Sequence, residues 1–439
     1  MCGIVGYIGE KDACGILVQG LKQLEYRGYD SAGVAVFADS RIQVSKTPGK
    51  VSELEKLLVN VPASKIGIGH TRWATHGEPT IVNAHPHTDC TGDIAIIHNG
   101  IIENYAALKT KLISMGHHFK SQTDTEVLAH LIEEFRTDGD SLDIALRRAL
   151  KEVDGTFGVV AMSATEPDLL VAARRGSPLV IGLGEAENLV ASDASALVKH
   201  TREVIYLHDN EIAILTRGNV SLKNLDDEVV EREAEHLSFD VEQIEKGGYP
   251  HFMLKEIHEQ PDTVLNAMRG RLLRDVGISN MGGLRDVEER ITGAKRFVIT
   301  ACGTSWHAAL VGKHIIEQCA RIPVEVDYAS EFRYRKPILQ NGDIVWTISQ
   351  SGETADTLAA LREARSNNVP VYGIVNVVGS TIARESDAGV YIHAGPEIGV
   401  ASTKAFTSQL AVLNLINLLV SRKKGMMDLQ QGRAIIDEM

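Results

Sequence analysis

The stretch DIVWTISQSGET, residues Asp343–Thr354, joins a continuous apolar run to a turn of Gly, Ser and Thr, and a helical pattern follows it. RFVITACGTS (Arg296–Ser305) repeats this pattern earlier in the chain, and VYGIVN (Val371–Asn376) repeats it later. Strands of a parallel sheet that is buried on both faces have such continuous apolar runs, and helices connect them. With a fourth strand expected at VYIHA (Val390–Ala394), the C-terminal part is predicted to be an α/β doubly wound domain.

The residues before this part have a different pattern. Up to about Leu225, short β-type runs alternate with turn residues, and helices are expected at 103–115, 124–136 and 141–153. Many strands with few intervening helices indicate antiparallel sheets flanked by helices, an α+β layered domain. The charged, helical segment between the two parts is interpreted as a connector. The sequence therefore predicts a first domain at residues 1–225, a helical connector at 226–293 and a second domain at 294–439.

Composition narrows the function classes. The 439 residues are 44% hydrophobic and carry a formal net charge of −13, which suits a well-cored globular protein and disfavours binding to nucleic acid or anionic membranes. The longest apolar run, Leu410–Val420, contains Asn414 and Asn417 and is too short for a membrane helix. Charged residues near the N-terminus argue against an export signal. We therefore expect a cytoplasmic protein without membrane or nucleic-acid partners.

The chain has five cysteines, an odd number with no Cys-x-x-Cys pair, which indicates a reducing compartment and neither a disulfide framework nor a zinc cage. Cys2 follows the initiator directly, so removal of Met1 would put a thiol and a free α-amine on one residue. An α-amine with a pKa of about 7.7–8.0 can accept the thiol proton near neutral pH, which makes the pair a self-contained nucleophile. The alternative is a buried cysteine that happens to occupy position two.

Neighbouring motifs favour the nucleophile. They are MCGIVG (1–6), RGYDSAG (27–33), HTRWATHG (70–77), NAHPH (83–87), HNGIIEN (98–104) and SQTDTE (121–126). In this order they resemble the glutaminase domain of the class II, N-terminal-nucleophile amidotransferases, across about the first 220 residues. The resemblance implies an αββα layered glutaminase fold. It also implies that a cysteine thiolate attacks the glutamine amide, releases ammonia and leaves a thioester that water hydrolyses to glutamate.

By this resemblance Cys2 is the nucleophile, and the Asn99 amide with the Gly100 N–H forms the oxyanion hole, a role that suits preorganised donors. The substrate carries a carboxylate for the Arg72 guanidinium and an ammonium group for Asp124. The remaining glutamine-site residues implied by the resemblance are Trp73, Thr75 and His76, with Arg27 supporting the cysteine loop. Arg72 and Asp124 could also be ordinary surface charges.

Three histidines, His76, His85 and His87, raise the possibility of a metal site, since His-x-His can reach one ion from a strand. No Cys or spaced carboxylate motif completes a ligand set near them. The sequence therefore predicts neither a metal nor another cofactor.

The turns CGTS (302–305) and SQSGET (349–354) each follow a buried strand and open a helix. Unsatisfied N–H groups at a helix N-terminus, together with Ser and Thr hydroxyls, can hold a phosphate without Lys or Arg. Each turn alone is a weak signal, because Ser or Thr after a strand is more often only an N-cap. Two such turns on parallel strands of one domain favour phosphate binding by an otherwise acidic protein.

The sequences of these turns, together with ASEFRYR (329–335) and EIGVASTKAF (397–406), resemble the first sugar-isomerase (SIS) domain of the glutamine:fructose-6-phosphate aminotransferase family. That family converts fructose 6-phosphate and L-glutamine to glucosamine 6-phosphate and glutamate. The phosphosugar residues implied by the resemblance are Thr304, Ser305, Ser349, Gln350, Ser351, Thr354, Val400 and Ser402. Cys302 is interpreted as structural or sugar-lining, because no α-amine or nearby His motif activates it.

The family has a second SIS domain, and the resemblance assigns to it the lysine, glutamate and histidine of the isomerase step. The sequence ends at Met439 after one such domain. Either it is a C-terminally incomplete copy, or the protein stops short and is a glutaminase fused to a phosphosugar-binding regulatory module. Other class II amidotransferases are disfavoured, because no ATP-binding SGGxDS-type loop and no acidic diphosphate-binding signature follows residue 230. SIS domains commonly pair in this family, so a homodimer is expected.

Overall fold

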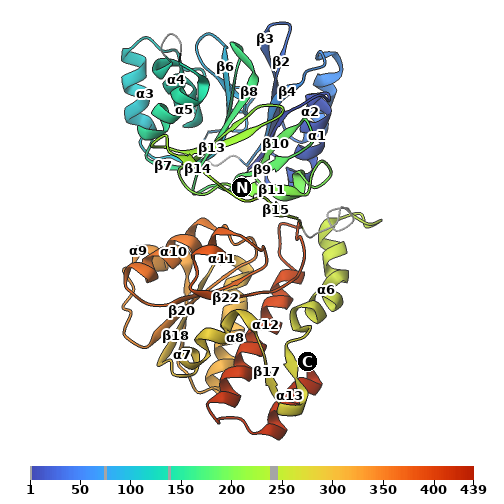
Figure 1. Ribbon diagram of the computed structural model, residues 1–439, viewed down its shortest axis with the longest axis vertical. Coiled ribbons are helices and arrows are strands. Elements are labelled where there is room, and N and C mark those ends of the chain that lie inside the picture. Colours follow the sequence, from blue (N-terminus) through green and yellow to red (C-terminus); the bar gives the residue numbers. More distant parts are fainter. Residues whose placement is uncertain (1, 74–76, 137–139, 238–245) are drawn as a thin grey trace. The chain divides into compact units, whose positions relative to one another are not determined.

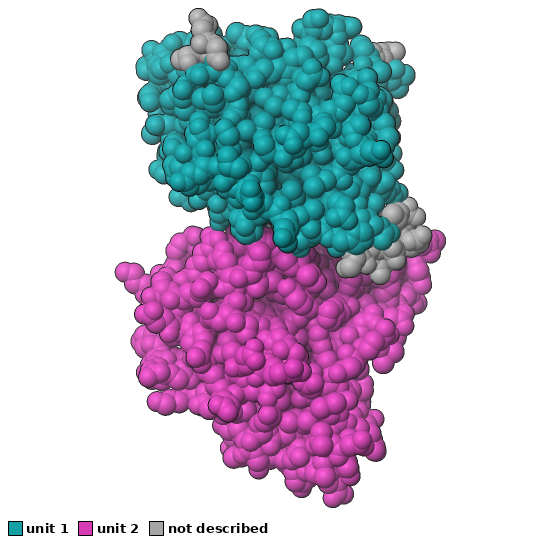
Figure 2. Space-filling model, in the orientation of Figure 1, with its two compact units in different colours: residues 1–241 teal, residues 242–439 magenta. Residues whose placement is uncertain are grey.

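The computed structural model describes residues 2–73, 77–136, 140–237 and 246–439. The chain forms two compact units, residues 1–241 and 242–439 (Figure 2). The segment expected to be a connector is shared between them. Its first residues pair with the sheets of unit 1 as far as His236, and helix α6 (Phe252–Met268) belongs to unit 2. The domain boundaries expected from the sequence, 1–225, 226–293 and 294–439, remain a prediction.

Unit 1 contains two antiparallel sheets that face each other, with helices on the outer faces (Figure 1). The eight-stranded sheet runs, in spatial order, β15 (Glu235–His236), β11 (Glu203–Tyr206), β9 (Val180–Leu183), β10 (Asn188–Ala191), β1 (Gly3–Ile8), β4 (Ile66–Arg72), β2 (Ser31–Ala38) and β3 (Arg41–Pro48). The seven-stranded sheet runs β14 (Val229–Val230), β13 (Val220–Asn224), β12 (Glu211–Leu215), β8 (Glu166–Arg175), β7 (Gly155–Ser163), β6 (Ile94–Ile102) and β5 (His87–Thr88).

Strand β6 shows how the layers are held together. Its residues Ile94 and Ile96 pack in the core under the helices, whereas Ala95 and Ile97 pack in the core between the sheets. A strand covered on both faces needs apolar residues at every position, and successive side chains point to opposite faces. The predicted αββα fold of the glutaminase domain is confirmed.

The helices of unit 1 are α1 (Ala13–Leu24), α2 (Val51–Leu57), α3 (Tyr105–Ser114), α4 (Thr125–Phe135) and α5 (Leu142–Lys151). The three helices predicted at 103–115, 124–136 and 141–153 are confirmed within two residues at either end. In α4 the apolar residues recur on one face and pack against β6 and α5. The N-terminus of this helix lies beside the candidate active site described below.

Unit 2 is built on a five-stranded parallel sheet with helices on both faces (Figure 1). The spatial order is β19 (Val324–Tyr328), β18 (Arg296–Ala301), β20 (Asp343–Ser349), β21 (Val371–Val375) and β22 (Ala388–Tyr391). The helices and the short hairpin are α6, α7 (Glu288–Thr292), α8 (Gly303–Cys319), α9 (Ala329–Tyr334), α10 (Ala355–Ser366), α11 (Thr381–Glu385), α12 (Lys404–Lys423), α13 (Leu429–Glu438), β16 (Leu272–Leu273) and β17 (Ile278–Ser279).

Both faces of this sheet are buried. Phe297 and Ile299 of β18 pack under α8 and α12, while Val298 packs on the opposite face under α9 and α10. The predicted doubly wound α/β domain is confirmed. Strand β19 was not predicted, because its sequence VEVDY alternates with polar residues instead of forming a continuous apolar run. It lies at the sheet edge, where most of its residues are only partly buried.

Helix α12 is long and apolar enough, by length and composition, to cross a membrane. In unit 2, 72% of the 18-residue stretch of α12 that meets these criteria is buried. Ser408, Gln409 and Asn417 are also buried on this helix, and its apolar side chains pack in the main core of the unit. In this structure α12 is therefore a core helix.

Candidate active site

Cys2 precedes β1, near the middle of the eight-stranded sheet. Its Sγ accepts a hydrogen bond from the Trp73 N–H at 3.3 Å, and its carbonyl oxygen accepts one from Asn99 Nδ2 at 3.0 Å. Trp73 follows the end of β4 in the same sheet, whereas Asn99 lies on β6 of the other sheet. Packing of the two sheets therefore brings three motifs that are distant in sequence together at Cys2, with Trp73 at its thiol and Asn99 at its carbonyl oxygen.

The orientation of the Asn99 amide is fixed from both ends. Its Oδ1 lies 2.9 Å from His70 Nε2, while its Nδ2 donates to Cys2. Burial lowers the pKa of His70 to about 3, so this imidazole is neutral. A neutral His70 that donates from Nε2 makes Oδ1 the acceptor, and the donor end of the amide then faces Cys2.

The backbone at position 100 requires glycine. Its φ is +135°, and a Cβ at this position would lie 2.1 Å from the Thr156 carbonyl oxygen. Any other residue would displace β7 from β6. Gly100 lines the same pocket as Cys2.

Arg72 and Asp124 line this pocket too, and both are buried, with 4% and 8% of their surface exposed. Arg72 donates to the carbonyl oxygens of Gly77 and Glu78 at 3.1 and 3.2 Å, and Asp124 Oδ2 accepts the Ile102 N–H at 2.8 Å. Burial lowers the pKa of Arg72, and the opposite charges of Cys2 and Asp124 counteract this effect. The pocket thus holds one buried cation and one buried anion beside the thiol.

The thiol itself responds to opposing influences. Burial raises the pKa of Cys2, whereas the Trp73 N–H and the positive charges of Arg72 and Arg27 lower it. The N–H and the guanidinium groups favour the thiolate, which is the nucleophilic form.

Trp73 is 38% exposed, and its ring stands edge-on to Tyr29 with centroids 5.3 Å apart. Gly28 lies against the backbone here, because a Cβ on it would be 2.6 Å from the Arg72 carbonyl carbon and 2.7 Å from the Trp73 nitrogen. This close approach holds the end of β4, and with it the N–H that contacts Cys2. Thr75 and His76, the other predicted glutamine-site residues, lie outside the described residues.

Arg27 acts at a distance from the pocket. It donates to the Ser192 carbonyl oxygen at 3.2 Å and pairs with Asp193 at 3.0 Å. The Ser192 hydroxyl accepts the Ile4 N–H at 3.0 Å. Arg27 therefore contacts the segment that holds the start of β1, two residues beyond Cys2.

The pocket wall also contains residues to which the sequence analysis assigned no role there, namely His85, His98, Thr123 and Thr125. His85 stacks on His70 with ring centroids 4.1 Å apart, and its Nδ1 accepts the His98 N–H at 3.3 Å. His87 Nε2 lies 3.1 Å from Thr123 Oγ1. His85 and His87 thus bind protein groups. The signal for these residues was present, because each lies inside a quoted motif.

In unit 2 the turn between β20 and α10 forms a compact polar group. Ser349 Oγ accepts the Gly352 N–H at 3.0 Å and lies 3.1 Å from Thr354 Oγ1, and Ser351 Oγ accepts the Glu353 N–H at 3.1 Å. Thr354 is the N-cap residue of α10. Gln350 is half-buried in the same turn. Hydroxyls and a helix N-terminus therefore meet at this edge of the sheet.

The other predicted phosphosugar residues lie in two further segments. Thr304 and Ser305 open α8, where the buried Ser305 accepts a hydrogen bond from Gln409 Nε2 at 2.9 Å. Val400 is 74% exposed, and Ser402 donates to Glu397 Oε2 at 2.7 Å, just before α12. Both segments follow strands of the same sheet.

Cys302 is the N-cap residue of α8. Its Sγ accepts from Thr357 Oγ1 at 3.8 Å, and burial raises its pKa. Burial raises the pKa of Cys2 as well, but Cys302 has no α-amine of its own to accept the thiol proton, so it stays interpreted as structural or sugar-lining.

Comparisons with known proteins agree with this arrangement. A glutamine amidotransferase domain model matches residues 59–252, and a SIS domain model matches residues 290–419. The chain is 54% identical to glutamine--fructose-6-phosphate aminotransferase [isomerizing] of Chlorobaculum tepidum, over 96% of this chain and 70% of that protein. For the proteins of the same name from Bacteroides thetaiotaomicron and Clostridium acetobutylicum, identity is 53% and 50%, over 100% and 97% of this chain and 72% and 69% of theirs.

Proposed function

Because the chain belongs to the glutamine--fructose-6-phosphate aminotransferase family, we propose that it takes the amide nitrogen of L-glutamine and uses it to convert D-fructose 6-phosphate to D-glucosamine 6-phosphate. L-glutamate is the second product. The synthase site is incomplete in the 439 residues, because the resemblance assigns the isomerase residues to a second SIS domain. The observation that carries the proposal is the contact of the Cys2 thiol with the Trp73 N–H in a pocket that also holds Arg72 and Asp124.

Glutamine hydrolysis begins at Cys2. With Met1 removed, the α-amine of Cys2 accepts the thiol proton, directly or through water, and the thiolate attacks the side-chain amide carbon of glutamine. The S–C bond forms, the C–N bond breaks, and ammonia leaves with the transferred proton. Water then hydrolyses the thioester and returns the free thiol with glutamate.

Asn99 and Gly100 stabilise the tetrahedral intermediate in this proposal. The Asn99 amide is held with its donor end toward Cys2 by His70, so it needs little reorganisation when negative charge develops on the substrate oxygen. Glycine allows the backbone conformation of position 100, where a Cβ would lie 2.1 Å from the Thr156 carbonyl oxygen, and we assign its N–H to the oxyanion hole.

Glutamine recognition falls to Arg72 and Asp124, the two buried groups of opposite charge in the pocket. Arg72 faces the α-carboxylate as a planar donor fork, and Asp124 accepts from the α-ammonium group. Trp73, Thr75 and His76 complete the site, and Arg27 supports it through Ser192 and Asp193.

The SIS domain binds the phosphosugar. We assign the phosphate to the hydroxyls of Ser349, Ser351 and Thr354 and to the N-terminus of α10, with Ser305 and Gln350 contributing, because these groups attract an anion without a basic side chain. Thr304, Val400 and Ser402 are assigned to the sugar. The free thiols of all five cysteines support a cytoplasmic location, and the net charge of −13 disfavours nucleic acid and membrane as partners. A homodimer is assigned because SIS domains commonly pair in this family.

The test is a product assay with the 439-residue chain, amide-¹⁵N glutamine and fructose 6-phosphate. Release of glutamate is the expected result of the glutaminase assignment, and ¹⁵N in glucosamine 6-phosphate is the result that would show the full synthase activity. Failure to form glutamate overturns the glutaminase assignment. Glutamate without glucosamine 6-phosphate supports the alternative, in which this chain is a glutaminase joined to a phosphosugar-binding regulatory module.

A further inference from the structure

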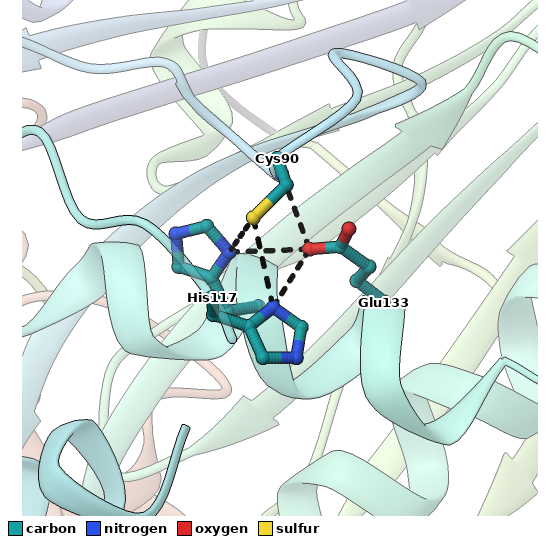
Figure 3. A group of neighbouring side chains, drawn as sticks. Cys90, His117 and Glu133 are labelled. Carbon is teal, nitrogen blue, oxygen red and sulfur yellow. Dashed lines mark hydrogen bonds and ion pairs between the residues drawn. The ribbon is translucent and has the colours of Figure 1, made fainter. Parts of the chain in front are cut away.

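Four side chains with metal-binding atoms converge in unit 1, outside the glutamine pocket. They are Cys90, His117, His130 and Glu133, called here the Cys90 cluster, and their ligand atoms all lie within 4.8 Å of one another. Figure 3 shows the thiol of Cys90, the imidazole of His117 and the carboxylate of Glu133 pointing toward one another. His117 and His130 are buried, and Cys90 is at the surface.

Four of the six separations are close to the edges of a tetrahedron around one ion. Zinc bonds of about 2.3 Å to sulfur and about 2.0–2.1 Å to nitrogen or oxygen give tetrahedral edges of about 3.5 Å for S–N and about 3.3 Å for N–O. In the cluster, Cys90 Sγ lies 3.7 Å from His117 Nδ1 and 3.5 Å from His130 Nδ1. Glu133 Oε2 lies 3.0 Å and 3.2 Å from the same two nitrogens.

The outward-facing nitrogens of both histidines face carboxylates. His117 Nε2 lies 3.2 Å from Glu134 Oε2, and His130 Nε2 lies 3.8 Å from Glu126 Oε1. The Glu134 carboxylate is within hydrogen-bond distance of His117 Nε2 and leaves His117 Nδ1 as a lone-pair donor, which is how metal-bound histidines are oriented. At 3.8 Å the Glu126 carboxylate faces His130 Nε2 without a hydrogen bond. The Nδ1 atoms of both histidines face the Cys90 thiol and the Glu133 carboxylate.

The thiol of Cys90 and the carboxylate of Glu133 each accept a hydrogen bond from a backbone N–H. The His118 N–H donates to Cys90 Sγ at 3.4 Å, and the Cys90 N–H donates to Glu133 Oε2 at 3.1 Å. Hydrogen bonds from the backbone stabilise a thiolate and an ionised carboxylate. Without an ion, Glu133 Oε2 would have to accept from two histidines and this N–H.

We propose that the Cys90 cluster is a structural zinc site. One sulfur, two imidazole nitrogens and one carboxylate oxygen form a mixed set that suits Zn²⁺, and four protein ligands leave no open position for substrate. This proposal differs from the sequence-based prediction that the protein holds no metal.

The position of the site gives it a structural consequence. Cys90 lies in the loop between β5 and β6, His117 follows α3, and His130 and Glu133 are on α4. An ion held by these three segments would tie the loop that leads into the strand of Asn99 to the helix that begins next to Asp124. Only His-x-x-Glu on α4 is a local signal, because the other ligands are brought to it by the fold.

The first experiment measures metal in the full chain, purified without a polyhistidine tag and dialysed against metal-free buffer. We expect about one zinc per chain in the wild type, and at least about tenfold less in Cys90→Ser, which removes the sulfur ligand with little change in size. Cys14→Ser and Cys2→Ala are the matched controls, and both should keep the zinc. Equal zinc in Cys90→Ser and the wild type would overturn the proposal.

The second experiment replaces zinc with Co²⁺ in the chelator-treated wild type and so does not depend on a variant that folds. Intense tetrahedral ligand-field bands, a thiolate-to-cobalt charge-transfer band and a higher Tm on metal addition are the expected results. Less than stoichiometric zinc in the purified protein, together with no cobalt spectrum and no Tm shift, would refute the site. Glu133→Gln, which keeps the shape of the side chain, should weaken the cobalt complex without removing the sulfur band.

Discussion

The two candidate sites differ in the sequence distance over which they are built. Cys2 contacts Trp73, 71 positions away, and Asn99, 97 positions away. In unit 2, Ser349 contacts Gly352 and Thr354 within one turn of five positions. The proposed glutaminase site therefore exists only when both sheets of unit 1 are packed. The turn to which we assign the phosphate, residues 349–354, is formed by a single strand–helix connection. Changes in the first should alter the reaction, and changes in the second should alter affinity.

The largest effect is expected from Cys2→Ala. Removing the nucleophile should lower the rate of glutamate release by at least about 10⁴-fold, because no thioester can form. The measurement is glutamate release from glutamine, with Cys319→Ala, on helix α8 of unit 2, as the control that keeps activity. If Cys2→Ala still hydrolyses glutamine at the wild-type rate, the nucleophile assignment is wrong.

Asn99→Ala should have the next largest effect. Loss of one oxyanion donor lowers kcat by about 10²–10³-fold, while the KM for glutamine should change much less, because the donor acts mainly on the transition state. Steady-state kinetics of glutamate release test this, with Asn367→Ala, at the exposed end of α10, as the matched amide control. An unchanged kcat would remove Asn99 from the oxyanion hole.

The buried histidines of unit 1 should make its stability depend on pH. Burial lowers the pKa of His70 and of His87 to about 3, against a usual value of 6.5. Between these values the unfolded chain binds protons that the folded chain does not. Stability is therefore complete above about pH 6.5 and falls as the pH decreases, by up to about 1.4 kcal/mol per pH unit for each histidine.

Urea unfolding of wild type and His87→Gln at several pH values between 4 and 7 measures this dependence. The variant cannot be protonated at this position, so its stability should fall less steeply with decreasing pH than that of the wild type. Parallel curves would show that His87 is not held neutral by the fold.

The smallest effect is expected from Ser349→Ala. The variant loses the acceptor of the Gly352 N–H, and its affinity for fructose 6-phosphate should fall by about tenfold, which is about 1.4 kcal/mol. Isothermal titration calorimetry measures the affinity, and Ser366→Ala, at the exposed end of α10, is the control. Glutamate release in the absence of the sugar should be unchanged. A large loss of glutaminase activity would contradict the separation of the two sites.

Local patterns in the sequence were sufficient for much of the fold. The apolar runs that became β18, β20 and β21, and the helices α3, α4 and α5, were predicted because burial on one face or on both imposes a period that short segments carry. Strand β19 was missed because an edge strand keeps polar residues. Strand β6 was quoted for its HNG motif without being assigned as a strand.

The pocket was predictable only in part. The quoted motifs named Cys2, Arg72, Asn99 and Asp124, but they did not show that His70 orients Asn99 from 29 positions away. The Cys90 cluster was missed for the same reason. Its ligands lie on three segments, and only the pair on α4 has a recognisable spacing.

The sequence by itself determined which chemical groups the protein has and which secondary structures they belong to, because helix and strand periods and turn residues act over a few positions. The tertiary structure decided which of these groups meet. The contacts of Cys2 with Trp73 and Asn99, and the convergence of the Cys90 cluster, depend on sheet pairing and layer packing over tens of residues. Burial in those layers, absent from any local pattern, also sets the pKa values of the buried histidines.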